Sequence, residues 1–301
     1  YISVTGVQTC ALPIFLYLGS SSGLATVAAW TGESNQPSYL GAAYFGVSVA
    51  SAGDVNGDGY SDVAVGARGI TNGQSGEGQA FVYLGSSSGL ATTAAWTGES
   101  NLTGAEFGGR VASAGDVNGD GYSDLLVGAK GYASGQSSEG AAYLYLGSAS
   151  GLAGAHAWRQ ESNQPTAYFG ISVSSAGDVN RDGFSDVLVG ASYYNNGLSQ
   201  QGRAYLYLGS ASGLATTTAW LGQSDYASAR FGADVASAGD VNGDGYPDAI
   251  IGATGYGNGQ ATEGAAYLFY GNEGLGIGVA PRQLTTSDVP LQPLEIGRAH
   301  V

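Results

Sequence analysis

Four short loops carry oxygen-bearing side chains at alternate positions. The loop reads DVNGDGYSD twice, then DVNRDGFSD, then DVNGDGYPD. Positions one, three, five and nine offer carboxylate or amide oxygens and position seven its backbone carbonyl, which suits the roughly six to eight oxygen ligands that calcium takes. Glycine at position six allows a sharp turn around an ion. The pattern predicts about four calcium ions, held by Asp54, Asn56, Asp58, Tyr60 and Asp62; Asp116, Asn118, Asp120, Tyr122 and Asp124; Asp178, Asn180, Asp182, Phe184 and Asp186; and Asp240, Asn242, Asp244, Tyr246 and Asp248.

The alternative for these loops is that the Asp and Asn side chains only cap turns. Such turns need one or two of these residues, whereas three carboxylates within nine residues repel one another without a cation. Four divalent cations would change the formal charge from −15 to −7, so we expect the metal to be needed for stability. Magnesium fits less well because it prefers strict octahedral geometry and retained water. The loops lack the Glu at position twelve of an EF-hand.

The loops belong to a repeat that advances by 62 residues. Phe-Gly begins at Phe45, Phe107, Phe169 and Phe231, and Gly-Ala follows each acidic loop. The residue pattern of one repeat predicts four strands, near Phe45–Ala52, Asp62–Ala67, Ala80–Leu84 and Thr92–Trp96. Turn residues between them favour pairing of sequential strands, and a four-stranded meander at a fixed period is typical of a propeller blade.

The composition agrees with an all-β fold. The chain has 53 Gly, 20 Tyr, no Met and only 9 Lys+Arg, which favours strands and tight turns over helices. Small residues in the first strand suit the crowded centre of a propeller, and each Trp is expected to pack between blades. A β-solenoid is the weaker alternative because its coils are usually much shorter than this period.

The Phe-Gly, the GDVNGDGYSD loop, the VGA ending the second strand and the YLYLGS strand together resemble the FG-GAP repeat of integrin α-subunit propellers. The resemblance covers residues 15–275, and the high self-similarity and the Gly/Ser-rich turns look like those of bacterial or environmental members rather than animal integrins. It implies a seven-bladed propeller with calcium on the face away from ligand, of which about four and a half blades are present. The expected units are a half blade at 15–38, blades at 39–100, 101–162, 163–224 and 225–283, and a tail or following domain at 284–295.

Both ends of the chain are expected to be translated sequencing adapter, over residues 1–14 and 296–301. Back-translation of TCALPI gives a sequence whose reverse complement encodes the closing IGRAHV. Cys10, the single cysteine, would then not be native and would carry no information on redox compartment.

The connections opposite the metal loops differ most among the four copies and are expected to form a ligand face. Tyrosine offers large contact area at low entropic cost, and the alternative is that these tyrosines pack locally. The expected ligand-binding residues are Tyr39, Tyr44, Tyr132, Tyr193, Tyr194, Tyr226 and Tyr256.

The most favoured function is a calcium-binding module of a secreted or cell-surface protein that mediates adhesion or binds a protein or glycan. The alternatives are the non-catalytic propeller of a secreted hydrolase, similar to a glycosylphosphatidylinositol phospholipase D, and a structural spacer. We expect no catalysis, since His156 has no repeated partner and His300 falls in an adapter-like end. The negative charge argues against nucleic acid, and the sequence has no apolar run long enough for membrane insertion. Asn101 begins a single Asn-x-Thr glycosylation signal.

Overall fold

The computed structural model describes residues 13–34, 36, 41–257, 262–273 and 276–277. Over these ranges every regular element is a β-strand. No helix that could cross a membrane occurs in this part of the chain. The predictions for the adapter-like ends fall outside it almost entirely, but Ile14, the last residue of the first such segment, is a buried strand residue.

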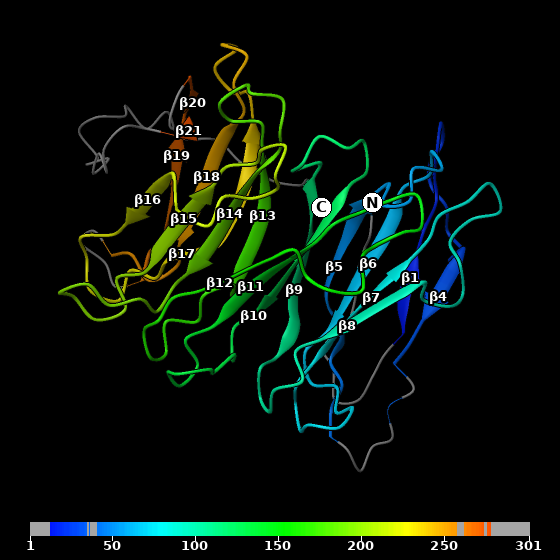
Figure 1. Ribbon diagram of the computed structural model, residues 1–301, viewed down its shortest axis with the longest axis horizontal. Helices are drawn as coiled ribbons and strands as arrows, with labels where there is room; N and C mark the ends of the chain where they lie inside the picture. The colour runs from blue at the N-terminus through cyan, green and yellow to red at the C-terminus, as the bar shows by residue number, and fades with distance from the viewer. Residues whose placement is uncertain (1–12, 35, 37–40, 258–261, 274–275, 278–301) are drawn as a thin grey trace, which may run out of the picture.

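The strands form successive antiparallel sheets, which Figure 1 shows following one another in chain order across the molecule. The half blade pairs β1 (Ile14–Leu16) with β4 (Trp30–Gly32) and carries the hairpin of β2 (Gly19–Ser20) and β3 (Gly23–Leu24). Blade 1 contains β5 (Phe45–Gly53), β6 (Asp62–Ala67), β7 (Gln79–Tyr83) and β8 (Trp96–Glu99). Blade 2 contains β9 (Phe107–Gly115), β10 (Asp124–Ala129), β11 (Ala141–Tyr145) and β12 (Trp158–Glu161).

Blade 3 contains β13 (Ser172–Gly177), β14 (Asp186–Ala191), β15 (Arg203–Tyr207) and β16 (Trp220–Gln223). Blade 4 contains β17 (Phe231–Gly239), β18 (Asp248–Ala253) and β19 (Ala265–Phe269), followed by the short pair β20 (Gly271–Asn272) and β21 (Gly276–Ile277). Sequential strands pair within each blade, and the first strands of adjacent blades contact one another. The prediction of an all-β protein built from propeller blades is confirmed.

The fourth strand lies further along the chain than predicted. It was expected to end at Trp96, but β8 begins there. It pairs antiparallel with β7, from Trp96 opposite Val82 to Glu99 opposite Gln79. Residues 91–95 instead form bends. Only two of their N–H groups donate toward the third strand, that of Ala95 to a carbonyl of β7 and that of Ala91 to the carbonyl of the residue directly after β7. The third strand is Gln79–Tyr83, shifted by one residue from the expected Ala80–Leu84.

The core lies between the blades. Alternate residues of a strand point to opposite faces, so each second strand contributes to two cores. In β10, Leu125 and Val127 join the cluster shared with blade 1, and Leu126 joins the cluster shared with blade 3. The repeat therefore stabilises neighbouring blades mutually, as expected of stacked units.

The Phe-Gly and Gly-Ala dipeptides meet at each blade junction. A Cβ added at Gly66 would collide with the carbonyl oxygen of Gly108, and one added at Gly128 would collide with that of Gly170. Gly108 and Gly170 themselves adopt left-handed φ values of 78° and 80°. Glycine is thus required on both sides of the contact by close backbone approach.

A tryptophan joins each blade to the next. The indole N–H of Trp96 donates to the carbonyl of Ala153 at 2.9 Å, and Trp158 donates to Ala215 at the same distance. Both rings are buried, which confirms that they pack between blades. Trp220 is also buried, but its N–H has no hydrogen-bond partner among the described residues.

Replacement of Glu77 by Gln is expected to raise stability by about 1 kcal/mol, measured by thermal unfolding. Glu77 is fully buried, its Oε1 accepts the N–H of Asn72 at 2.7 Å, and its Oε2 has no partner among the described residues. In blade 3, Gln201 stands at this repeat position and its Nε2 donates to the carbonyl of Ser224 at 2.9 Å. The amide would supply the missing donor in blade 1.

The reciprocal substitution Gln201→Glu provides the control, because it removes a donor from a buried carbonyl. It should lower the melting temperature. A lower melting temperature for Glu77→Gln would contradict the prediction.

Candidate functional site

Each acidic loop joins the first strand of a blade to the second. In blade 2 it occupies Asp116–Asp124, starting directly after β9 and ending on the first residue of β10. The glycines at positions four and six, Gly119 and Gly121, adopt left-handed φ values of 74° and 91°. These two residues wrap the backbone around the first aspartate.

The first aspartate organises the loop through backbone N–H groups. Asp116 Oδ1 accepts the N–H of Gly119 at 2.6 Å, and its Oδ2 accepts that of Gly121 at 2.8 Å. Asp120 Oδ1 accepts the N–H of Tyr122 at 3.0 Å, and its Oδ2 accepts the Asn118 side-chain amide at 2.9 Å. The same contacts of the first and fifth positions recur in the loops of blades 1 and 4.

The last aspartate of each loop is buried at the base. Asp124 accepts the N–H of Val117 at 2.9 Å through Oδ2 and that of Gly147 at 2.9 Å through Oδ1. Burial raises the pKa of Asp124 to about 6, the two N–H donors oppose the rise, and the charges of Asp120 and Asp116 add to it. Burial likewise raises the pKa of Asp186 to about 7.

The loops contain the oxygen ligands that a hard cation needs, but their carboxylates are not already arranged around one point. Among the described residues, no group of three or more Asp, Glu, His or Cys side chains is positioned to hold a metal ion. The carboxylate oxygens are instead turned toward loop N–H groups. Each carboxylate oxygen can accept more than one contact, and Asp116 and Asp120 lie close enough to Asp124 to raise its pKa. The donor set is therefore compatible with calcium.

Adjacent loops contact each other. Ser123 of the second loop donates its N–H to the carbonyl of Asp54 in the first at 2.9 Å. A Cβ added at Gly57 would lie 2.6 Å from Tyr122 Cε1, so glycine at position four makes room for the aromatic ring of the next loop. The third loop has Arg181 at this position, and its guanidinium lies 5.3 Å from the centre of the Tyr246 ring.

The remaining connections divide between two faces. The turn after each third strand lies beside an acidic loop, since Ser148 N–H donates to the carbonyl of Val55 at 3.1 Å. The other two kinds of connection meet at the opposite end of the strands, where Gly104 N–H donates to Ser75 at 2.9 Å. Of the tyrosines predicted to bind ligand, those that the structure describes belong to this opposite face.

The structure separates those tyrosines into exposed and buried ones. Tyr44 is 48% exposed and Tyr226 is 43% exposed, with the Tyr226 ring packed edge-on against Tyr256 at 4.7 Å. Tyr132 is only 3% exposed and lies beneath the guanidinium of Arg159, which leaves little of its side chain accessible to a ligand. Tyr193 and Tyr194 are partly buried beside Arg230 and Arg203. Tyr39 lies outside the described residues.

Sequence reasoning did not single out the charged residues beside the Gly-Ala and Phe-Gly dipeptides of this face. Arg68 and Lys130 directly follow the Gly-Ala of their blades, while Glu106 and Arg230 directly precede a Phe-Gly. Alignment of the four copies places these residues at two variable positions beside invariant ones. That contrast within the repeat was the signal available in the sequence.

Comparison with known proteins identifies the same repeat. A family model described as "FG-GAP repeat" matches residues 45–83, 107–145, 169–207 and 231–269, one segment in each of the four blades. Integrin alpha-V of Gallus gallus is 34% identical over 221 residues, which cover 70% of this chain and 20% of that protein. Integrin alpha-8 of Gallus gallus is 32% identical over 230 residues, covering 71% and 20%. Integrin alpha-IIb of Homo sapiens is 34% identical over 158 residues, covering 50% and 15%.

The chain thus spans about a fifth or less of the length of these relatives. Among solved structures, the exotype rhamnogalacturonan lyase YesX aligns with a TM-score of 0.44 and 15% identity, over 79% of this chain and 41% of that one. At this level of similarity the lyase carries no argument about function.

Proposed function

The chain belongs to the FG-GAP repeat family, and from this premise we propose that it is a calcium-binding, integrin-α-like propeller module of a secreted or cell-surface protein. It binds about four calcium ions through its acidic loops. The opposite face binds a protein or glycan partner and thereby mediates adhesion. The module itself is not catalytic.

The observation that carries the calcium proposal is the fourfold repetition of one loop on one face. In every copy the last aspartate is fully buried, namely Asp62, Asp124, Asp186 and Asp248. A buried carboxylate near two others is costly unless it is protonated or offset by positive charge. The loops of blades 1 and 2 contain no Lys or Arg, so a cation from solution is the natural source of that charge.

The proposal of a binding role depends on the two faces being different. One face carries the repeated acidic loops, and the other carries connections whose sequences differ from copy to copy. A constant scaffold with variable loops suits recognition. The integrin α relatives support a secreted or surface location for this chain.

Calorimetric titration with calcium tests the metal sites. The whole chain is expected to bind about four ions, and Asp120→Ala is expected to bind about three, because the variant removes the position-five carboxylate of one loop. Asp225→Asn provides a matched control, since it removes one negative charge from an exposed position on the opposite face.

Two results would reject the calcium proposal. The first is no heat of binding at millimolar calcium. The second is an unchanged stoichiometry in Asp120→Ala, which would place the bound ions outside the loops.

A further inference from the structure

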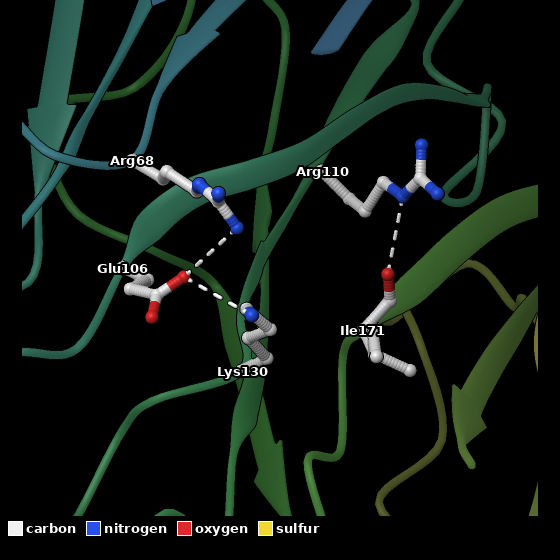
Figure 2. A network of polar contacts seen from close by, with 5 residues as sticks. All are labelled: Arg68, Glu106, Arg110, Lys130 and Ile171. Atoms are coloured by element: carbon white, nitrogen blue, oxygen red, sulfur yellow. Dashed lines mark hydrogen bonds and ion pairs between the residues drawn. The ribbon is translucent and has the colours of Figure 1, made fainter. Parts of the chain in front are cut away.

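A chain of charged and aromatic side chains crosses three blades on the face opposite the acidic loops. The Arg68 guanidinium lies 4.8 Å from the centre of the Tyr44 ring, and its NH1 lies 3.4 Å from Glu106 Oε2. Lys130 Nζ lies 3.3 Å from the same oxygen and 5.8 Å from the Tyr168 ring. Figure 2 shows Arg68 and Lys130 converging on Glu106.

The chain of contacts continues into blade 4. The Tyr168 ring packs against Tyr193 at 5.0 Å, and the guanidinium of Arg230 lies 5.0 Å from the centre of the Tyr193 ring. We name Tyr44, Arg68, Glu106, Lys130, Tyr168 and Arg230 the cationic belt. Along the chain, its members are in turn the residue before a Phe-Gly and the residue after a Gly-Ala. Blade 3 is the exception, because there Tyr193, two residues after the Gly-Ala, makes the contact between Tyr168 and Arg230.

Arg110 adds a further positive charge beside the belt. It pairs across the sheet with Gly128, two residues before Lys130. Its Nε donates to the carbonyl of Ile171 at 3.1 Å, which Figure 2 shows, and the side chain is exposed.

The backbone of the belt indicates that its large side chains are retained at a cost. Tyr44, Glu106, Tyr168 and Arg230 all adopt left-handed φ values between 52° and 55°. Such a conformation is strained for bulky residues, whereas glycine adopts it freely. This glycine-rich chain uses Gly two residues further on in every copy, yet keeps Tyr, Glu, Tyr and Arg here. Strained large residues of this kind are typical of functional sites.

The charge distribution is equally selective. Of the seven Lys and Arg among the described residues, only Arg181 belongs to an acidic loop; the other six lie toward the opposite face. Four of the six gather near the first strands of the blades, namely Arg68, Arg110, Lys130 and Arg230. The acidic residues at the beginnings of these first strands are Glu106 and Asp234. The belt is thus positive within a chain of formal charge −15.

We propose that the cationic belt binds the carboxylates of an acidic peptide segment of a partner protein. This inference rests on the proposed function, because it names the kind of partner that the ligand face would bind. A guanidinium held against an aromatic ring keeps its N–H edge oriented for a carboxylate. One face of the Tyr44 and Tyr168 rings is already covered by a cation, so the belt offers hydrogen-bond donors more than open rings for stacking. Tyr and Arg are also the residues most enriched at the energetic centres of protein interfaces.

The test uses fluorescein-labelled octaglutamate and octaglutamine, with binding to the calcium-saturated chain followed by fluorescence anisotropy. Octaglutamate is expected to bind at least about tenfold more tightly than octaglutamine, and added salt should weaken its binding. The double variant Lys130→Gln/Arg230→Gln should weaken octaglutamate binding about tenfold or more. The control Arg159→Gln/Arg203→Gln removes the same charge from the same face outside the belt and should change binding less than twofold.

Equal binding of the two peptides, or equal losses in the two double variants, would overturn the inference. Oligogalacturonate that binds through the belt when octaglutamate does not would identify an acidic glycan in place of a peptide. Calcium titration and thermal unfolding of the same preparations separate the two proposals. A chain that binds calcium and melts normally but ignores octaglutamate rejects only the belt, whereas a chain without calcium binding rejects the proposed function.

Discussion

Chelation of calcium is expected to lower the melting temperature of the chain by at least about 10 °C. A ligand that binds only the folded state stabilises it by about 2.7 kcal/mol when present at a hundred times its dissociation constant. Four such sites would add up to about 10 kcal/mol, and in domains of this size each 1 kcal/mol shifts the melting temperature by about 2–4 °C. Thermal unfolding followed by circular dichroism, with calcium and with excess chelator, measures the difference.

The mechanism of this destabilisation can be checked with salt. Without calcium, the three carboxylates of each loop repel one another, so added sodium chloride should recover part of the lost stability by screening. Restoring calcium should recover all of it. Equal melting temperatures with calcium and with chelator would mean that the aspartates only cap turns.

Replacement of Trp158 by Ala is expected to destabilise the chain by about 3–5 kcal/mol, the usual cost of removing a large buried aromatic side chain. The ring is 5% exposed, packs edge-on against Tyr207 at 4.9 Å, and donates its N–H to Ala215 in the next blade. Its loss would open the junction between blades 2 and 3. Chemical denaturation gives the free energy of unfolding directly.

A pair of conservative variants separates the hydrogen bond from the packing. Trp158→Phe should cost about 1 kcal/mol beyond the loss of ring volume, because it leaves the partly buried carbonyl of Ala215 without its donor. Trp220→Phe should cost less, since the N–H of Trp220 has no partner in the described part of the chain. Equal costs would show that the Trp158 hydrogen bond contributes nothing to stability.

The second strand of each blade was predictable from sequence because turn residues bound it on both sides. Asp62–Ala67 agrees with the expected bounds at both ends. The fourth strand was not, because nothing in TTAAW marks where pairing starts. The residue at which the fourth strand begins depends on its pairing register with β7, and the sequence of the fourth strand alone does not specify that register.

The candidate site divides in the same way. The acidic loops were evident because all of their candidate oxygen donors lie within nine consecutive residues, and the structure places each loop on a single turn. The cationic belt was not evident, because Arg68 and Glu106 are 38 residues apart and meet only when two blades pack side by side. The burial of Tyr132 was not evident for a related reason, since burial depends on neighbours that its own loop does not supply.

The sequence by itself therefore determined the repeat, the all-β blades and the loops, because each depends on local spacing and turn chemistry. Only the tertiary structure decided which tyrosines are exposed and which charges gather on one face. Those properties arise where one blade packs against the next. The requirement for glycine in both Phe-Gly and Gly-Ala has the same origin, because Gly128 and Gly170 are distant in sequence and their backbones touch only in the folded chain.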